Sequence, residues 1–174
     1  MKKLITTLLI LASLTSNANA QIAEDIKGEN ITPIKVEIQS NKNSDINHIL
    51  KLAKYHADIN TPYVFGAVSE GDNPKSFDCS SFVQWLYKQI DINLPRVSYE
   101  QAKCGTKVNI NDIQPGDIIC FITDNRNNGN VTHVGIYLGD GLFVHARNSR
   151  LDTRIDKYEG YWKAKTATIR RIVK

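Results

Sequence analysis

The sequence predicts an α+β domain with an antiparallel β-sheet. Residues 44–60 and 78–90 place their apolar side chains at the three- and four-residue spacing of amphipathic helices. From residue 117 onward the spacing changes to the two-residue alternation of strands, and the segment 139–141 joins two strands as a hairpin. Helices that precede a run of hairpin-connected strands are typical of the α+β class.

The first predicted helix follows a polar segment. Residues 21–43 indicate an N-terminal arm or linker, and a short strand at 34–38 is the alternative because apolar and polar residues alternate there. Ser44 is a suitable N-cap, and the helix should end near Asn60, ahead of Pro62. Its expected buried face consists of Ile46, Ile49, Leu50, Ala53 and Ala57.

The second predicted helix runs from Asp78 to Ile90. The carboxylate of Asp78 can accept hydrogen bonds from the free N–H groups of the first turn and so cap the helix. A short helix is expected at 98–103, ended by Gly105. The buried stripe of the second helix would consist of Phe82, Val83, Leu86 and Ile90.

Strands are predicted in the second half of the chain. The turn residues Pro115-Gly116 precede a strand at 117–122. Two further strands, 131–138 and 142–147, flank the hairpin loop, and the last predicted strand is 166–173.

Residues 1–20 have the pattern of a secretory signal peptide. Lys2 and Lys3 precede the apolar run Leu4–Leu11, and Ala18-Asn19-Ala20 matches a cleavage site. A membrane anchor is the alternative, but the run is too short to span a bilayer comfortably. We expect an exported protein in the periplasm or in the extracellular space and cell wall, with no membrane span after cleavage.

The composition fits one folded domain, expected at 44–174. The chain is 41% hydrophobic and 23% charged, which favours a packed core over disorder. Without the two lysines of the leader, the chain has 20 basic and 18 acidic residues. A net charge of +2 is too small to indicate nucleic-acid binding. We expect a monomer.

Cys79 would lie in the first turn of the second helix. The unpaired N–H groups and the partial positive charge of a helix N-terminus stabilise a thiolate, so we expect a lowered pKa and a nucleophilic role. The alternative is a small buried cysteine. With Cys104 and Cys120 the chain has three cysteines, an odd number, so at least one thiol cannot pair within the chain. Cys104 and Cys120 could form a disulfide or remain two buried thiols, and the sequence leaves both alternatives open.

A nucleophilic thiol requires a base, and the chain has four histidines. His48 and His56 fall on the first helix, where we expect a solvent-facing and a structural role. His133 and His145 fall on the two strands of the hairpin. Gly135, in the middle of the first of these strands, leaves room for a close approach.

The register of the hairpin decides whether His133 and His145 meet. A two-residue turn pairs residue 139 with 142 and places the two histidines on opposite faces. A three-residue loop at 139–141 pairs 138 with 142, so that Gly135 faces His145 and His133 is its diagonal neighbour. A glycine at the end of the loop favours the second arrangement. Cys79, His133 and His145 would then be the nucleophile, the base and the residue that orients the base.

Five motifs follow one another in a recognisable order: TPYVFG, FDCSSFVQWLY, LPRVSYEQ, QPGDIICF and THVGIYLGDGLFVHA. From about Thr61 to Ala146 the chain resembles the NlpC family of cell-wall cysteine peptidases. The resemblance implies a papain-like fold, in which a helix carrying the catalytic cysteine packs against an antiparallel sheet. It also implies that Cys79, His133 and His145 are catalytic.

The resemblance implies further site residues. Tyr63 matches a tyrosine that lines the site near the oxyanion, with a packing role as the alternative. Asp78 and Ser80 match positions near the substrate amine or the helix cap, and for Asp78 we favour the cap. The family usually has glycine at the positions of Ala67 and Ser81, so the shape of the substrate pocket is expected to differ here.

The resemblance also implies a substrate and a reaction. The expected enzyme hydrolyses peptide bonds in peptidoglycan stem peptides through a thioester acyl-enzyme, without a metal or other cofactor. The favoured bond joins the γ-carboxyl of D-glutamate to a diamino acid. A D-alanyl–diaminopimelate cross-link, a thiol acyltransferase or amidase with another acyl substrate, and a non-catalytic wall-binding module are the alternatives. A coupled cysteine–histidine pair predicts a bell-shaped pH–rate profile.

Overall fold

The computed structural model describes residues 33–124 and 128–173, with side chains from residue 41 onward. The predicted leader at 1–20 lies outside the described residues. The chain divides into two compact units, 1–41 and 42–174. Within the described ranges, no helix is both long enough and apolar enough to cross a membrane.

Helix α2 (Pro33–Asp58) begins eleven residues earlier than predicted. Ser44 lies inside this helix, so its assignment as the N-cap is wrong, as is the strand proposed over 34–38. Of the predicted arm, residues 33–43 are helical and residues 21–32 lie outside the described residues. Proline is favoured in the first turn of a helix, and no glycine or proline interrupts residues 34–58. The helix ends close to the predicted Asn60, which adopts a positive φ of 49°.

Helix α3 (Cys79–Lys88) begins as predicted, with Asp78 as its N-cap. Asp78 Oδ1 accepts from the backbone N–H of Ser81 at 2.7 Å, and Ser81 Oγ accepts from the backbone N–H of Asp78 at 2.9 Å. This reciprocal capping box fixes the first turn. The predicted stripe is buried except at Ile90, which is half-buried. Helix α4 (Ser98–Gln101) follows.

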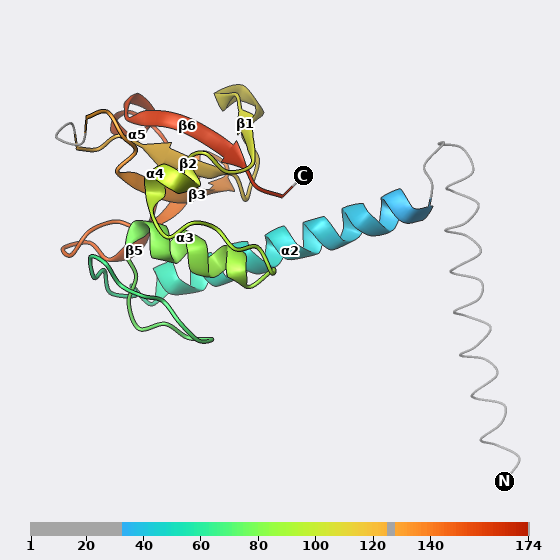
Figure 1. Cartoon of the computed structure of the whole chain (residues 1–174), viewed down its shortest axis with the longest axis horizontal. Helices are drawn as coiled ribbons and strands as arrows, with labels where there is room; N and C mark the ends of the chain where they lie inside the picture. Colours follow the sequence, from blue (N-terminus) through green and yellow to red (C-terminus); the bar gives the residue numbers. More distant parts are fainter. Residues whose placement is uncertain (1–32, 125–127, 174) are drawn as a thin grey trace, which may run out of the picture. The chain divides into compact units, whose positions relative to one another are not determined.

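The sheet is antiparallel throughout and has the strand order β1-β6-β2-β3-β4-β5. Figure 1 shows α3 lying along one side of this sheet. The predicted α+β class is therefore confirmed. The sequence analysis missed β1, β5 and the short helix α5 (Tyr161–Ala164). The strands are β1 (Thr106–Val108), β2 (Ile118–Phe121), β3 (His133–Gly139), β4 (Leu142–Ala146), β5 (Thr153–Lys157) and β6 (Thr166–Arg171).

The β3–β4 hairpin combines features of both predicted registers. Gly139 pairs with Leu142, as a two-residue turn requires, and both turn residues between them have positive φ. An irregularity then shifts the register, so that Ile136 pairs with Val144. The predicted three-residue loop is wrong, but the body of the hairpin has the face assignment that this loop was expected to produce.

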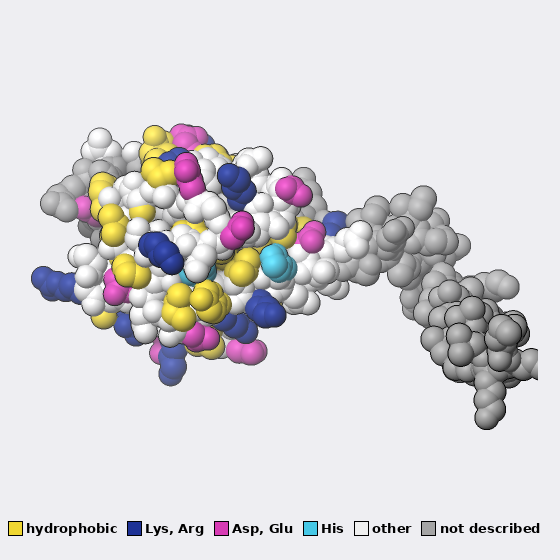
Figure 2. Space-filling view, turned by 90° about the horizontal axis from the view of Figure 1, so that it is seen from below, with side chains coloured by type: hydrophobic (Ala, Val, Ile, Leu, Met, Phe, Trp, Pro, Cys, Tyr) yellow, Lys and Arg dark blue, Asp and Glu magenta, His cyan; other side chains and the backbone are white. Residues whose placement is uncertain are grey.

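Two apolar clusters cover the two faces of the sheet. The alternation along β2 directs Ile118 and Cys120 to the cluster beneath α3, and Ile119 and Phe121 to the opposite cluster. Trp162 of α5 belongs to this second cluster. Charged side chains of both signs are spread over the surface seen in Figure 2, in keeping with the small net charge.

Gly135 is expected to be essential for the stability of the hairpin. A Cβ at this position would lie 2.8 Å from the backbone oxygen of Val144 and 2.9 Å from a ring carbon of Phe143. We expect Gly135→Ala to lower the free energy of unfolding by roughly 2 to 3 kcal/mol. Gly141→Ala is the matched control, because its Cβ meets open space and only the positive φ costs about 1 kcal/mol. Equal losses for both variants, measured by urea denaturation, would contradict the steric argument.

Candidate active site

Cys79 is the first residue of α3 and is 8% exposed. Its thiol accepts hydrogen bonds from the backbone N–H groups of Val134, the residue after His133, and of Ser80. Burial and the nearby Asp78 carboxylate raise the pKa of Cys79 to about 12, and the two N–H groups only partly offset this. The expectation of a lowered thiol pKa is therefore wrong for the isolated group, because the side chain is removed from water.

His133 and His145 lie together, as the predicted face assignment requires. The Nε2 atom of His133 and the Nδ1 atom of His145 are 2.7 Å apart, and the two side chains are buried. The indole of Trp162 stacks on the imidazole of His133 with centroids 5.5 Å apart. Because Nε2 is engaged with His145, Nδ1 is the ring nitrogen through which His133 can take a proton.

Burial also shapes the titration of the two histidines. It lowers the pKa of His133 well below 6.5, and His145 and Arg147 act in the same direction. Burial likewise lowers the pKa of His145, although the carboxylate of Asp156 opposes it. A raised thiol pKa and lowered histidine pKa values favour a neutral thiol and neutral imidazoles at pH 7.

Asp156 on β5 is a neighbour of the histidine pair that the sequence analysis missed. Its Oδ2 atom lies 3.2 Å from His145 Nε2 and accepts from Arg147 at 2.8 Å, and its Oδ1 atom accepts from Arg154 at 2.8 Å. Burial acts to raise the pKa of Asp156, but His145 and the two arginines outweigh it and hold the pKa at about 2. Asp156 is therefore ionised at neutral pH.

Asp78 is held by several groups at once. Arg96 donates to its Oδ1 atom at 3.1 Å and to its Oδ2 atom at 2.6 Å, and Ser80 Oγ donates to Oδ1 at 3.2 Å. The backbone N–H of Gly66 donates to Oδ2 at 3.1 Å. Burial would raise the pKa of this carboxyl, but these donors lower it overall. Arg96 belongs to the LPRVSYEQ motif and was not singled out by the sequence analysis.

Tyr63 lies beside the same helix end. It forms a bridge with Phe77, and its backbone N–H donates to the carboxylate of Asp152 at 2.9 Å. Burial raises the pKa of its phenol to about 12, and the charges of Cys79 and Asp78 add to the effect. The hydroxyl is therefore a neutral hydrogen-bond donor at pH 7.

The remaining candidates have structural or surface positions. His56 is buried, with its Nδ1 atom 2.9 Å from Thr61 Oγ1, whereas His48 is exposed, and both placements match the predictions. All three cysteines lie in the described part of the chain and are free thiols, so Cys104 and Cys120 form no disulfide. Cys104 is half-buried and Cys120 is fully buried.

Ser81 and Ala67, at the two positions where the resemblance implies glycine, are both buried. Ser81 is 1% exposed and its hydroxyl is used in the helix cap. Ala67 is also buried, and its backbone oxygen accepts from Arg96 at 2.7 Å. Both side chains are buried, and a change in the shape of the substrate pocket at these two positions stays a prediction.

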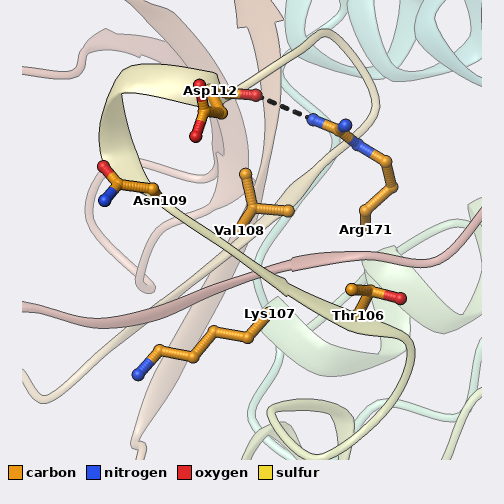
Figure 3. Close-up of a pocket in the computed structure, with 6 residues that line it drawn as sticks. All are labelled: Thr106, Lys107, Val108, Asn109, Asp112 and Arg171. Atoms are coloured by element: carbon orange, nitrogen blue, oxygen red, sulfur yellow. Dashed lines mark hydrogen bonds between the residues drawn. The ribbon is translucent and has the colours of Figure 1, made fainter.

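A pocket lies at the β1–β6 side of the sheet, two strands away from β3. Figure 3 shows Lys107 and Arg171 at this pocket, where Arg171 Nη2 donates to the backbone oxygen of Asp112 at 2.8 Å. None of the predicted site residues lines it. The lining residues are Thr106, Lys107, Val108, Asn109, Asp112 and Arg171.

The order of the site residues and the fold agree with a known family. The sequence model of the NlpC/P60 family matches residues 60–171. The chain belongs to this family. The match includes the cysteine, both histidines and Asp156, and it confirms the resemblance drawn from the motifs. As a member of the NlpC/P60 family, the chain has the α+β fold of its structural neighbours.

Individual relatives of this NlpC/P60 chain show how far the likeness extends. A Gamma-DL-glutamyl hydrolase of Bacillus subtilis is 38% identical over 130 residues, which are 74% of this chain and 29% of the relative. The Murein DD-endopeptidase MepS/Murein LD-carboxypeptidase of Escherichia coli is 36% identical over 104 residues, 59% of this chain and 53% of the relative. The structure of NlpC2 from Trichomonas vaginalis is 33% identical, with a TM-score of 0.66 over 75% of this chain and 47% of that one. The chain thus spans about half or less of each of these three proteins.

Proposed function

We propose that the chain is a cysteine endopeptidase that hydrolyses peptide bonds in peptidoglycan stem peptides. The observation that carries the proposal is the placement of Cys79 at the start of α3, hydrogen-bonded to the strand residue that follows His133, while His133 contacts His145. A nucleophile, a base and an orienting group are the parts that acyl transfer requires. The names of the Bacillus subtilis and Escherichia coli relatives support a substrate of this class.

The proposed reaction proceeds in two steps. In the first, the thiol of Cys79 transfers its proton to Nδ1 of His133 while the sulfur attacks the carbonyl carbon of the scissile bond. The backbone N–H groups at the start of α3 and the hydroxyl of Tyr63 are the proposed donors to the oxyanion. His133 then gives the proton to the leaving amine, which leaves a thioester. In the second step, water hydrolyses the thioester with His133 as the base, and the thiol is restored.

Asp78 and Ser80 are candidates either for a position near the substrate amine or for the cap of α3. Asp78 is paired with Arg96, so the pair is neutral overall and attracts a cation less strongly than a free carboxylate would. We therefore assign Asp78 chiefly to the cap of α3. We assign Ser80, which is 5% exposed and whose Oγ donates to Asp78 and accepts from Arg96, to holding this pair in place.

The favoured bond joins the γ-carboxyl of D-glutamate to a diamino acid. The name of the Bacillus subtilis relative, a Gamma-DL-glutamyl hydrolase, supports this choice, and the name of the Escherichia coli relative supports the alternative D-alanyl–diaminopimelate cross-link. The test incubates the chain with two synthetic peptides, each containing one of these bonds, and with intact peptidoglycan. Mass spectrometry of the products identifies the bond. Release of no fragment from any of the three substrates would refute the proposed function.

Action on the wall requires export, and we propose that the chain is exported. The three-part leader pattern at 1–20 supports this proposal. Fractionation of cells that produce the full chain tests it, because an N-terminus at Gln21 in the exported fraction is expected.

The pH–rate profile is expected to be a broad bell. Only the neutral imidazole of His133 can accept the thiol proton, and its pKa lies well below 6.5 because it is buried. Activity should therefore persist at mildly acidic pH and decline only as the pH falls through that lowered pKa. The alkaline limb should lie far above neutrality, because the pKa of Cys79 is raised to about 12. Measurements of kcat/KM against pH, with circular dichroism as the control for folding, check this. An acidic limb at or above pH 6.5 would contradict it.

A further inference from the structure

We propose that Asp156 is a positioning residue that fixes the tautomer of His145 and thereby keeps His133 able to accept the proton of Cys79. The expected effects on kcat, KM and the pH–rate profile rest on the proposed function, whereas the expected tautomers do not. It begins from the chain of contacts His133–His145–Asp156, in which the two linking distances are 2.7 Å and 3.2 Å. His145 is 0% exposed, so water does not compete for these contacts.

The charge of Asp156 decides which ring nitrogen of His145 carries the proton. An ionised carboxylate can only accept, so His145 must place its N–H at Nε2, towards Asp156 Oδ2. The neutral imidazole of His145 then has a lone pair at Nδ1, which accepts from Nε2–H of His133. Under this arrangement Nδ1 of His133 has a free lone pair. When Nδ1 gains the thiol proton, Nε2–H is unchanged and the imidazolium keeps its acceptor.

The opposite tautomer would block the reaction. If His145 carried its proton at Nδ1, it would donate to Nε2 of His133, and the neutral ring of His133 would hold its own proton at Nδ1. That ring has no lone pair left for the thiol proton, and its protonation would place two N–H groups against each other. The thiolate–imidazolium pair therefore requires the tautomer that Asp156 selects.

Two arginines hold Asp156 in its ionised form and fix its position. Arg147 binds Oδ2 and Arg154 binds Oδ1, so each carboxylate oxygen has an arginine partner. The side chain of Asp156 is 10% exposed. The charged and titratable groups that act on His133 are His145, Arg147 and Asp156, and those that act on His145 are Asp156, Arg147 and Arg154. Among them, Asp156 alone carries the negative charge that stabilises an imidazolium.

The first test uses the unmodified chain. NMR of isotope-labelled histidine distinguishes the two tautomers by the nitrogen shifts and the couplings to the ring protons. We expect His145 in the Nε2–H form and His133 with its proton at Nε2. Finding His145 protonated at Nδ1 would overturn the proposal, whatever the substrate of the enzyme proves to be.

The second test compares Asp156→Asn with Asp156→Glu. The asparagine amide can donate to His145 Nε2 and so permit the wrong tautomer, whereas glutamate keeps the charge. We expect Asp156→Asn to lower kcat roughly 10- to 100-fold with little change in KM, and to move the acidic limb to lower pH. The rate at which iodoacetamide alkylates Cys79, followed by peptide mass spectrometry, should fall in parallel at neutral pH. Asp156→Glu should recover part of each loss.

Asp117→Asn is the matched control. Asp117 is also buried and accepts from Arg171 through two hydrogen bonds of 2.8 Å, but it lies on the β6 side of the sheet, remote from the histidines. Both substitutions remove a carboxylate that is at most 10% exposed and is paired with arginine, so both should lower the thermal stability. Alkylation needs no peptide, so this readout remains valid if the proposed substrate is wrong. If both variants alter only stability and neither alters the alkylation rate or the pH profile, Asp156 has a structural role and the proposal fails.

Discussion

Cys79→Ala is expected to lower the rate of peptide hydrolysis at least about 10³-fold. The substitution removes the sulfur that forms the thioester, and the described site offers no second thiol at the start of α3. Tyr63 and the helix N–H groups would remain in place, so substrate should still bind. The measurement is release of fragments from peptidoglycan and from the synthetic peptides, read by mass spectrometry, together with binding of the intact substrate by the inactive variant.

Cys104→Ser is the control for this experiment. Cys104 is half-buried, its thiol lies 3.5 Å from the backbone oxygen of Glu100, and a hydroxyl can make the same contact. The variant should retain the activity of the unmodified chain. If Cys79→Ala released the same fragments as the unmodified chain, the thioester mechanism would be wrong. If Cys79→Ala and Cys104→Ser were both inactive, the loss would not be specific to the proposed nucleophile.

The parts of the site that the sequence predicted correctly depend on local signals. Asp78 caps α3 because an acceptor stands directly before an apolar helical stripe, and that pattern is visible in a few consecutive residues. The meeting of His133 and His145 was predicted correctly but from a loop length that is wrong, because a register shift between Tyr137 and Gly139 places the two histidines on one face. The motifs around these residues then identified the family.

The parts that were missed depend on contacts between distant segments. Strand β5 reads Thr-Arg-Ile-Asp-Lys, with Ile155 as its one apolar residue, so its partner β4 rather than its own pattern makes it a strand. Asp156 was missed for the same reason. The early start of α2 was missed because Ser44 is a good cap in isolation, and an uninterrupted helix overrides it.

The raised pKa of Cys79 also depends on contacts between distant segments. The position of the residue in the first turn of a helix indicates stabilisation of a thiolate, and the N–H groups of Val134 and Ser80 do act in that direction. The extent of burial is set by the packing of α3 on β3, which no local pattern reveals, and it outweighs them. A partner that takes the proton is therefore more important here than the helix end.

That partner is tested by His133→Ala, for which we expect kcat to fall at least about 10³-fold at neutral pH. Without an imidazole, the thiol must ionise unaided, and its pKa is about 12. The residual rate should therefore increase about tenfold with each pH unit, because the thiolate fraction rises in that proportion below the pKa. The unmodified chain should instead show a plateau. This difference in shape separates the loss of a base from a loss of folded protein, which would lower the rate equally at every pH.

His145→Ala and His48→Ala complete the comparison. His145→Ala keeps the base but removes the acceptor at 2.7 Å, so we expect a smaller fall, roughly 10- to 100-fold, with the plateau retained. His48 is exposed on α2 and its substitution should leave the rate unchanged. Rates for His133→Ala that stay flat with pH would mean that another group takes the thiol proton. Equal losses in His133→Ala and His145→Ala, with the same rising profile, would mean that neither imidazole acts without the other, and that the base is the hydrogen-bonded pair rather than His133 alone.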